Sequence, residues 1–145
     1  MSAIVYVAGE AVTMRARGSA MTFKAIGEQT GQAFSFMERE VPAGATAPPP
    51  HIHEGPEGFY VLEGELTFDV DGERTTVGSS GFVLVPGGDV HTFSNKSSES
   101  ARVLIIHAPA ADRYFADLQE LWSGPQPPEK EQVDALLARH GMRPA

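Results

Sequence analysis

Apolar and polar residues alternate in short runs along the first 110 residues, and turn residues separate the runs. Over residues 65–70 every second side chain is apolar, which predicts a strand with one buried face. Asp71-Gly72 is a two-residue hairpin signal, followed by a polar return strand over 73–77. Further strands are predicted at 32–41 (with Phe34 and Phe36 on one face), 59–63, 82–85, 91–94 and 103–106. Many short strands joined by Gly, Pro and Asn turns favour an antiparallel sandwich or barrel.

The periodicity changes near residue 111. Over residues 112–122 apolar side chains recur at helical spacing, and Asp112 is placed to act as the N-cap. A Gly/Pro-rich interruption at 124–128 precedes a second helix, for which Gly141 is the expected C-cap. The helix dipole alone explains His140 beside that end. We therefore divide the chain into a β-barrel, residues 1–110, and a helical tail, residues 111–145, which packs on the outside of the barrel or across its mouth.

Composition narrows the classes of function. The 145 residues fit one domain with a single core. The net charge of −8 disfavours nucleic acid as a partner, because an acidic surface repels phosphate backbones. The first residues lack the basic region and long apolar stretch of a signal peptide, and no run reaches membrane-spanning length, so we expect a cytoplasmic protein with no membrane partner. The chain has no cysteine, so His and carboxylate side chains must hold any metal.

Three histidines and one glutamate form a candidate metal site. His51 and His53 are two apart, so on an extended backbone both imidazoles project from the same face. Glu57 follows after a tight connection that can fold its carboxylate back toward them, and His91 comes from a separate hairpin. Three nitrogens and one oxygen suit divalent Fe, Mn, Co, Ni, Cu or Zn and disfavour Ca²⁺ and Mg²⁺. An octahedral metal held by four side chains would keep two positions open for water, dioxygen or substrate.

Around these residues the sequence resembles the cupin superfamily. The first cupin motif, within residues 44–64, is matched by Gly44, His51-Ile52-His53, Glu57 and Gly64. The second, within residues 81–95, is matched by Pro86-Gly87-Gly88, His91 and Asn95. Gly44 lies one residue farther from His51 than is usual, and Gly81 one residue closer to Pro86. Both departures affect turns and leave the four ligands in place.

The resemblance implies an all-β double-stranded β-helix, the jelly-roll cupin barrel, with a short helical C-terminal tail. It also implies one divalent transition metal per chain, with Fe, Ni or Mn favoured over Zn, Co or Cu, held by His51, His53, Glu57 and His91. The segment 59–66 and the tail are similar to the small cupins grouped with quercetin 2,3-dioxygenase, which implies a dioxygenase-type oxidoreductase acting on a small aromatic or enolisable substrate. As in those quercetinases, Glu57 would also act as a base toward a substrate hydroxyl. Cupins commonly form homodimers, so a homodimer is expected.

Two other classes of function stay open. One is a metal-dependent isomerase, cyclase or lyase on the same scaffold, in which the metal stabilises an enolate and no dioxygen is consumed. The other is a non-catalytic binding or sensor domain that uses the metal only to hold a small ligand. The same four ligands serve all of these chemistries, so the fold does not choose among them.

Strand parity assigns further side chains to the inside of the barrel. Phe59 and Phe93 share the parity of Glu57 and His91, so both should point inward near the metal. They are the predicted substrate-binding residues, forming an apolar wall that suits a planar molecule. His107 ends an apolar strand, and we interpret it as a structural histidine.

Tyr60, Leu62 and Leu84 take the opposite parity and should lie on the outer face. Apolar residues on both faces of a sheet indicate that the outer face is covered. The tail helices or a dimer partner are the two candidates for that cover.

Overall fold

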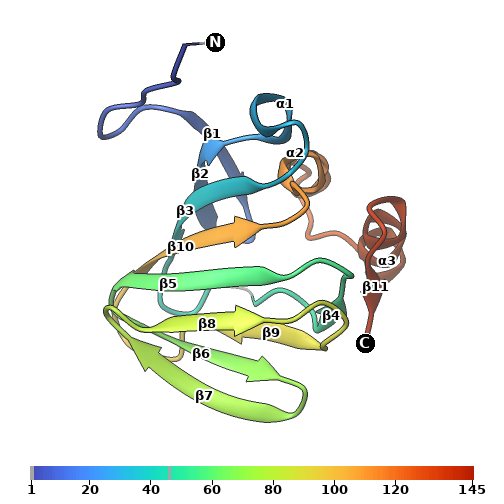
Figure 1. The fold of residues 1–145 in the computed structure, drawn as a ribbon. Helices are drawn as coiled ribbons and strands as arrows, with labels where there is room; N and C mark the ends of the chain where they lie inside the picture. Colours follow the sequence, from blue (N-terminus) through green and yellow to red (C-terminus); the bar gives the residue numbers. More distant parts are fainter. Residues whose placement is uncertain (1, 46) are drawn as a thin grey trace.

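Two antiparallel sheets form the body of the protein in a computed structural model that describes residues 2–45 and 47–145. One has six strands in the order β1-β2-β3-β10-β5-β8, and the other has five in the order β11-β4-β9-β6-β7 (Figure 1). From β3 onward the chain crosses from one sheet to the other between successive strands, except at the β6–β7 hairpin, which lies within one sheet, as expected for a jelly roll. The predicted all-β jelly-roll fold is therefore confirmed, and residues 1 and 46 of the predicted barrel lie outside the described residues.

The described residues form fourteen elements in chain order. Their bounds are β1 Val12–Ala16, β2 Ser19–Ala25, α1 Gly27–Thr30, β3 Ser35–Val41, β4 His51–Ile52, β5 Glu57–Glu63, β6 Glu65–Val70, β7 Glu73–Gly78, β8 Phe82–Val85, β9 His91–Ser94, β10 Ala101–His107, α2 Asp112–Leu121, α3 Lys130–Arg139 and β11 Arg143–Pro144.

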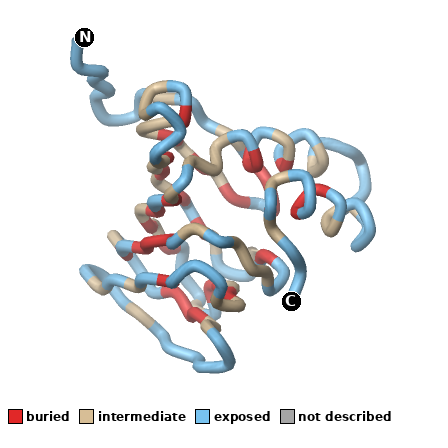
Figure 2. The backbone as a smooth tube through the Cα atoms, turned by 45° about the vertical axis from the view of Figure 1, so that its right-hand side comes forward, coloured by how far each residue is buried: buried red, intermediate tan, exposed pale blue. Residues whose placement is uncertain are grey.

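The core lies between the two sheets, where alternate side chains of facing strands meet. Buried positions, red in Figure 2, recur along the strands and in the two tail helices, whereas the N-terminal segment is exposed. Phe59 of β5 packs edge-on against Phe68 of β6 and Phe93 of β9, with ring centroids 5.1 and 5.4 Å away. Each such buried side chain stabilises the fold by roughly 1.5–3 kcal/mol, so this aromatic contact ties one sheet to the other.

Local signals locate several elements correctly. Val70 pairs with Glu73, and Asp71 and Gly72 between them have φ of 49° and 85°, the conformation of a type I′ hairpin. The strands predicted at 82–85 and 91–94 have those bounds in the structure. Apolar side chains flanked by Gly and Pro turns leave little freedom over where such short strands begin and end.

The strand predicted at 32–41 begins at Ser35, and its faces differ from expectation. Met37, Arg39 and Val41 are buried, whereas Phe36 lies on the outer face and is half-buried. The inner face thus carries a guanidinium in place of a fully apolar stripe. Before β3 the sequence predicts β-structure only in general terms. The structure has two strands, β1 and β2, and the short helix α1 in this segment.

The tail begins differently from the sequence prediction. Ala111 is the N-cap of α2, and Asp112 is the first helical residue. The Asp112 Oδ1 atom accepts a hydrogen bond from the backbone N–H of Gly27 at 2.8 Å, so this side chain ties α2 to the start of α1 and does not cap its own helix. Phe115 and Leu118 of α2, and Leu136 and Leu137 of α3, are buried.

After α3 the chain returns to the barrel as β11, which pairs with β4. The two tail helices lie to one side of the sheets (Figure 1) and leave Tyr60 and Leu84 on the outer face of the six-stranded sheet exposed. Of the two covers predicted for that face, the tail helices are therefore excluded and a dimer partner stays a prediction. Within the described residues, no helix is long and apolar enough to span a membrane.

Candidate metal centre

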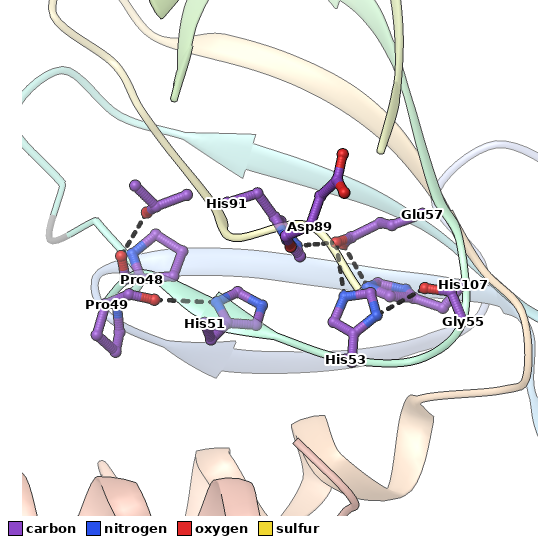
Figure 3. Close-up of polar contacts among 10 residues, drawn as sticks. Pro48, Pro49, His51, His53, Gly55, Glu57, Asp89, His91 and His107 are labelled. Atoms are coloured by element: carbon purple, nitrogen blue, oxygen red, sulfur yellow. Dashed lines mark hydrogen bonds and ion pairs between the residues drawn. The ribbon is translucent and has the colours of Figure 1, made fainter. Parts of the chain in front are cut away.

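Four predicted ligands converge at one end of the barrel. His51 is on β4, His53 lies just after it, and Glu57 and His91 are the first residues of β5 and β9. Four of their donor atoms, one from each side chain, lie within 4.8 Å of one another, and Figure 3 shows these side chains turned toward a common point. We call these residues the four-residue cluster. Its members come from both sheets, since β5 belongs to one and β4 and β9 to the other.

The chain fixes each imidazole of the cluster through its Nδ1 atom. Each Nδ1 lies 2.8–3.0 Å from a backbone carbonyl oxygen two residues away in sequence. A carbonyl can only accept a hydrogen bond, so Nδ1 carries the proton and donates it. The Nε2 atoms are thereby left to bind a metal, in the arrangement that orients ligating histidines. The acceptors are Pro49 for His51, Gly55 for His53 and Asp89 for His91.

Histidines surround the Glu57 carboxylate. Its Oε1 lies 3.3 Å from His53 Nε2 and 2.9 Å from His91 Nε2, and its Oε2 lies 2.6 Å from His107 Nε2. Burial by itself would raise the pKa of Glu57, but the charge and hydrogen bond of His107, with the bonds from His53 and His91, hold that pKa well below its usual value. The carboxylate is therefore ionised, as a metal ligand must be.

Two histidines of the cluster differ in how readily they bind a proton. Burial and the neighbouring His91 lower the pKa of His51 to about 4, so His51 is neutral at pH 7. Burial also acts to lower the pKa of His91, but its hydrogen bond to Glu57 and the charge of that carboxylate outweigh this and raise the pKa above its usual value. A proton thus competes with a metal for His91 more strongly than for His51.

His107, interpreted from the sequence as structural, contacts the centre directly. It ends β10 at the position paired with Glu57 on β5, and its Nε2 atom holds Glu57 Oε2. It does not belong to the four-residue cluster. Among the described residues its buried Nδ1 atom has no hydrogen-bond partner. His107 and Glu57 are neighbours because β5 pairs with β10. The sequence alone does not reveal this strand pairing, so it does not predict the contact.

A cavity of about 410 Å³ opens beside the cluster. Phe93 lines it together with Tyr114, Phe115 and His140 from the tail, so the tail forms part of the wall. Phe59, the other predicted substrate-binding residue, is buried behind Phe93 in the core and does not line the cavity. Contact with a ligand in this cavity would therefore be made by Phe93.

Two arginines of the cavity wall were missed by sequence analysis. Arg39 projects inward between Met37 and Val41, and Arg17 lies in the turn between β1 and β2. Parity along β3 could have revealed Arg39, because it shares a face with two apolar residues. No comparable signal marks Arg17, whose position depends on how the turn packs.

The donor set fits a divalent transition metal. Three imidazole nitrogens and one ionised carboxylate are preferred ligands of such ions, and all four side chains are preoriented without the ion. The carboxylate is fixed on its far oxygen by His107. His51, His53, Glu57 and His91 are thus the residues that would hold the metal.

Comparison with known proteins agrees with this architecture. Residues 37–107 match the family described as Cupin domain. The chain is 29% identical over 91 residues to the curated protein quercetin 2,3-dioxygenase from Bacillus subtilis, a match that covers 60% of this chain but 27% of that protein. The chain therefore spans about a quarter of the length of this relative.

Solved structures show the same fold at low sequence identity. The polyketide cyclase RemF from Streptomyces resistomycificus aligns with a TM-score of 0.63 and 23% identity, over 74% of this chain and 80% of that one. An RmlC-like cupin from Shewanella frigidimarina aligns with a TM-score of 0.66 and 17% identity, over 78% and 96%. At these identities the likeness concerns the fold alone.

Proposed function

We propose that this chain is a metal-dependent oxidoreductase of the dioxygenase type, acting on a small aromatic or enolisable substrate; the match of residues 37–107 to the Cupin domain family supports this proposal. The observation that carries the proposal is the convergence of three preoriented imidazoles and an ionised carboxylate beside a cavity with aromatic walls. The likeness to quercetin 2,3-dioxygenase favours dioxygen chemistry over other uses of the site.

The proposal assigns a role to each residue of the centre. His51, His53 and His91 would hold the metal through Nε2, and Glu57 would be the fourth ligand through Oε1, the oxygen that faces His53 and His91. A bound Fe, Ni or Mn ion would supply redox and Lewis-acid chemistry at this point. Phe93 places a planar substrate beside the ion, and Phe59 supports Phe93 from behind.

Glu57 is also the proposed base toward a substrate hydroxyl. A carboxylate whose pKa is held low is a good ligand but a weak base, because efficient proton transfer needs a pKa near the working pH. Glu57 Oε2 remains in contact with His107 Nε2 on the side away from the cluster. His107 therefore controls how easily Glu57 accepts a proton.

A second candidate is a metal-dependent cyclase, isomerase or lyase. The fold likeness to the polyketide cyclase RemF keeps this class in view, and the Glu57–His107 pair could move a proton on an enolisable substrate without dioxygen. A binding domain that only holds a ligand at the metal is the third. Both of these alternatives need the same four metal ligands, so metal binding is tested before the type of reaction.

Elemental analysis of the purified protein tests the centre. We expect close to one equivalent of a divalent transition metal per chain, and its loss in the double variant His51→Ala, His91→Ala. The matched control is His140→Ala, a histidine on the cavity wall outside the cluster, which should keep its metal. Equal metal content in the double variant and the native protein would refute the site.

Oxygen uptake separates the classes of reaction. Protein reconstituted in turn with Fe, Ni, Mn and Co is supplied with a flavonol and with enolisable acids, and dioxygen consumption is recorded beside substrate loss. Uptake that matches substrate loss supports the dioxygenase. Substrate loss without uptake supports the cyclase, isomerase or lyase. If no substrate is consumed with any metal, although the metal is bound, the binding domain is the better description.

A further inference from the structure

Two positively charged side chains are buried in the wall of the cavity that holds the cluster. Arg17 and Arg39 are 4% and 3% exposed, and both line this cavity. A guanidinium keeps its charge in proteins, and a buried one is normally paired with a carboxylate. Among the ion pairs of residues 2–45 and 47–145, neither arginine takes part.

Their protein partners are neutral groups. Arg17 donates from Nη2 to the Tyr114 hydroxyl at 3.3 Å, and Arg39 donates from Nε to Ser19 Oγ at 2.9 Å. The Arg39 guanidinium carbon also lies 5.1 Å from the centre of the Phe93 ring. These contacts hold both side chains in place but leave their charge uncompensated.

Each of the two guanidinium groups has nitrogens beyond the one in its hydrogen bond, and both side chains line the cavity. Within the described part of the chain, the fully buried side-chain polar atoms without a partner are His107 Nδ1 and Trp122 Nε1. The other nitrogens of Arg17 and Arg39 are not among them, so none of these nitrogens is both fully buried and without a partner. Donors that are rigidly held, charged and accessible are what an anion requires.

The two charges also repel each other across the cavity wall. Burial, and then the charge of Arg17, lower the pKa of Arg39 to about 10. The carboxylate of Glu57 opposes this effect, but it is already engaged by His53, His91 and His107. A metal in the cluster would add further positive charge. The two guanidinium groups therefore have positive charge left to pair with an anion.

The backbone at Arg17 supports a function for its position. Arg17 and Gly18 form the turn of the β1–β2 hairpin, and Arg17 has a φ of 53°. This left-handed conformation favours glycine, asparagine or aspartate, and a long side chain there carries a cost in stability. The turn places the Arg17 guanidinium at the cavity wall. Glycine, asparagine or aspartate at this position would place no positive charge there.

We propose that Arg17 and Arg39 bind the carboxylate of an organic acid whose opposite end reaches the four-residue cluster. Two guanidinium groups match the two oxygens of a carboxylate, and the Phe93 and Phe115 rings in the same cavity wall suit the apolar body of an organic acid. A cavity of about 410 Å³ holds a small acid with a single ring or short chain. That this acid is the substrate rests on the proposed function, whereas binding of the anion does not.

Calorimetric titration of the full chain, freed of metal with a chelator and dialysed, tests the anion site. The probes are benzoate, its neutral isostere benzamide, and inorganic phosphate. We expect benzoate to bind at least tenfold more tightly than the other two. Arg17→Gln and Arg39→Gln should each weaken benzoate at least tenfold, and Arg39→Lys should weaken it less than Arg39→Gln because it keeps the charge.

The matched control is Arg102→Gln on the outer face of the sheet. Arg102 pairs there with Glu38 and Glu63, so benzoate affinity should not change. Equal binding of benzoate and benzamide, tighter binding of phosphate, or unchanged affinity in both Gln variants would each overturn the proposal. The titrations use metal-free protein, so their outcome is independent of the measured metal content. If the native protein contains metal but its metal-free form does not bind benzoate, only the anion site is refuted.

Discussion

At the level of single residues, the ligands of the centre differ in their protonation. His51 is already in the neutral state that a metal needs, whereas His91, below its pKa, must first lose a proton. His51 has a pKa of about 4 and is neutral over the whole physiological range. His91 has a raised pKa because Glu57 accepts its hydrogen bond, so at pH values below that pKa a proton occupies the Nε2 atom that a metal would need. Metal binding at His91 therefore means exchange of a proton for an ion.

This exchange predicts how pH affects the protein. The folded-state pKa of His91 lies above its ordinary value of 6.5, so its contribution to stability is complete below pH 6.5 and is lost as pH rises through the folded pKa. The metal-free protein should therefore lose stability above pH 6.5. Metal should bind more tightly over the same range, because the competing proton is leaving. The rise in Tm caused by metal should grow from pH 5.5 to 8.

Thermal unfolding with and without metal at several pH values measures this effect. The Glu57 carboxyl, with its lowered pKa, contributes stability that is lost only as pH falls through its folded pKa, below this window. In a His91→Gln variant the metal-free decline above pH 6.5 should disappear. A metal-induced shift in Tm that is constant from pH 5.5 to 8 would contradict the assignment.

At the level of elements, the loops around the centre are packed backbone against backbone. A Cβ atom on Gly87 would lie 1.7 Å from the Glu54 carbonyl oxygen, and one on Gly55 would lie 1.9 Å from that of Ala108. The N–H of Gly88 also donates to the His53 carbonyl oxygen at 2.9 Å. The turn before β9 thus rests directly on the connection that carries His53.

Gly87→Ala should separate these two loops. The added methyl group would meet a backbone atom, which cannot move as a flexible side chain can, so we expect a loss of roughly 1–3 kcal/mol in unfolding free energy and weaker metal binding. Chemical denaturation and metal titration measure the two effects. Gly124→Ala is the control, because its nearest heavy atom, the Gln126 carbonyl oxygen, lies at 3.9 Å. Equal stability of the two variants would show that the loops are loosely packed.

The sequence predicts those elements whose signals are local. The hairpin at Asp71-Gly72 and the strands β8 and β9 are marked by turn residues and apolar runs, and the cluster by the spacing of His51, His53 and Glu57. Features that depend on which strands are neighbours were not predictable. His107 reaches Glu57 only because β10 pairs with β5, and Arg17 enters the cavity only because its turn folds over the barrel.

At the scale of the whole molecule, one face of the six-stranded sheet is apolar and uncovered. Tyr60, Phe82, Leu84 and Ile106 are between 38% and 60% exposed and lie on the adjacent strands β10, β5 and β8. Gly58 lies between Ile106 and Phe82, where it keeps the surface flat. Arg102 and Glu63 on the same sheet carry both signs of charge, so the face can complement a copy of itself related by a two-fold axis.

We therefore propose that this face joins two copies of the chain, and we expect sedimentation of the native protein at micromolar concentration to give a dimer. The double variant Phe82→Glu, Leu84→Glu should be monomeric, because it would bury four unpaired charges in the symmetric contact. Val12→Glu is the control, since Val12 is a similarly exposed apolar residue on the opposite edge strand. A native monomer, or a dimeric double variant, would exclude this interface.

The ligands of the centre come from both sheets, so a bound metal would affect how quickly the protein unfolds and is degraded. The chain has no cysteine and so no disulfide to fasten one layer to the other. A metal held by β4 and β9 on one side and by β5 on the other would act as a removable cross-link, because the layers could not part without releasing it. Unfolding would then be slow in the loaded protein and fast in the stripped one. The cellular lifetime of the chain, measured against proteases, would follow the supply of its metal.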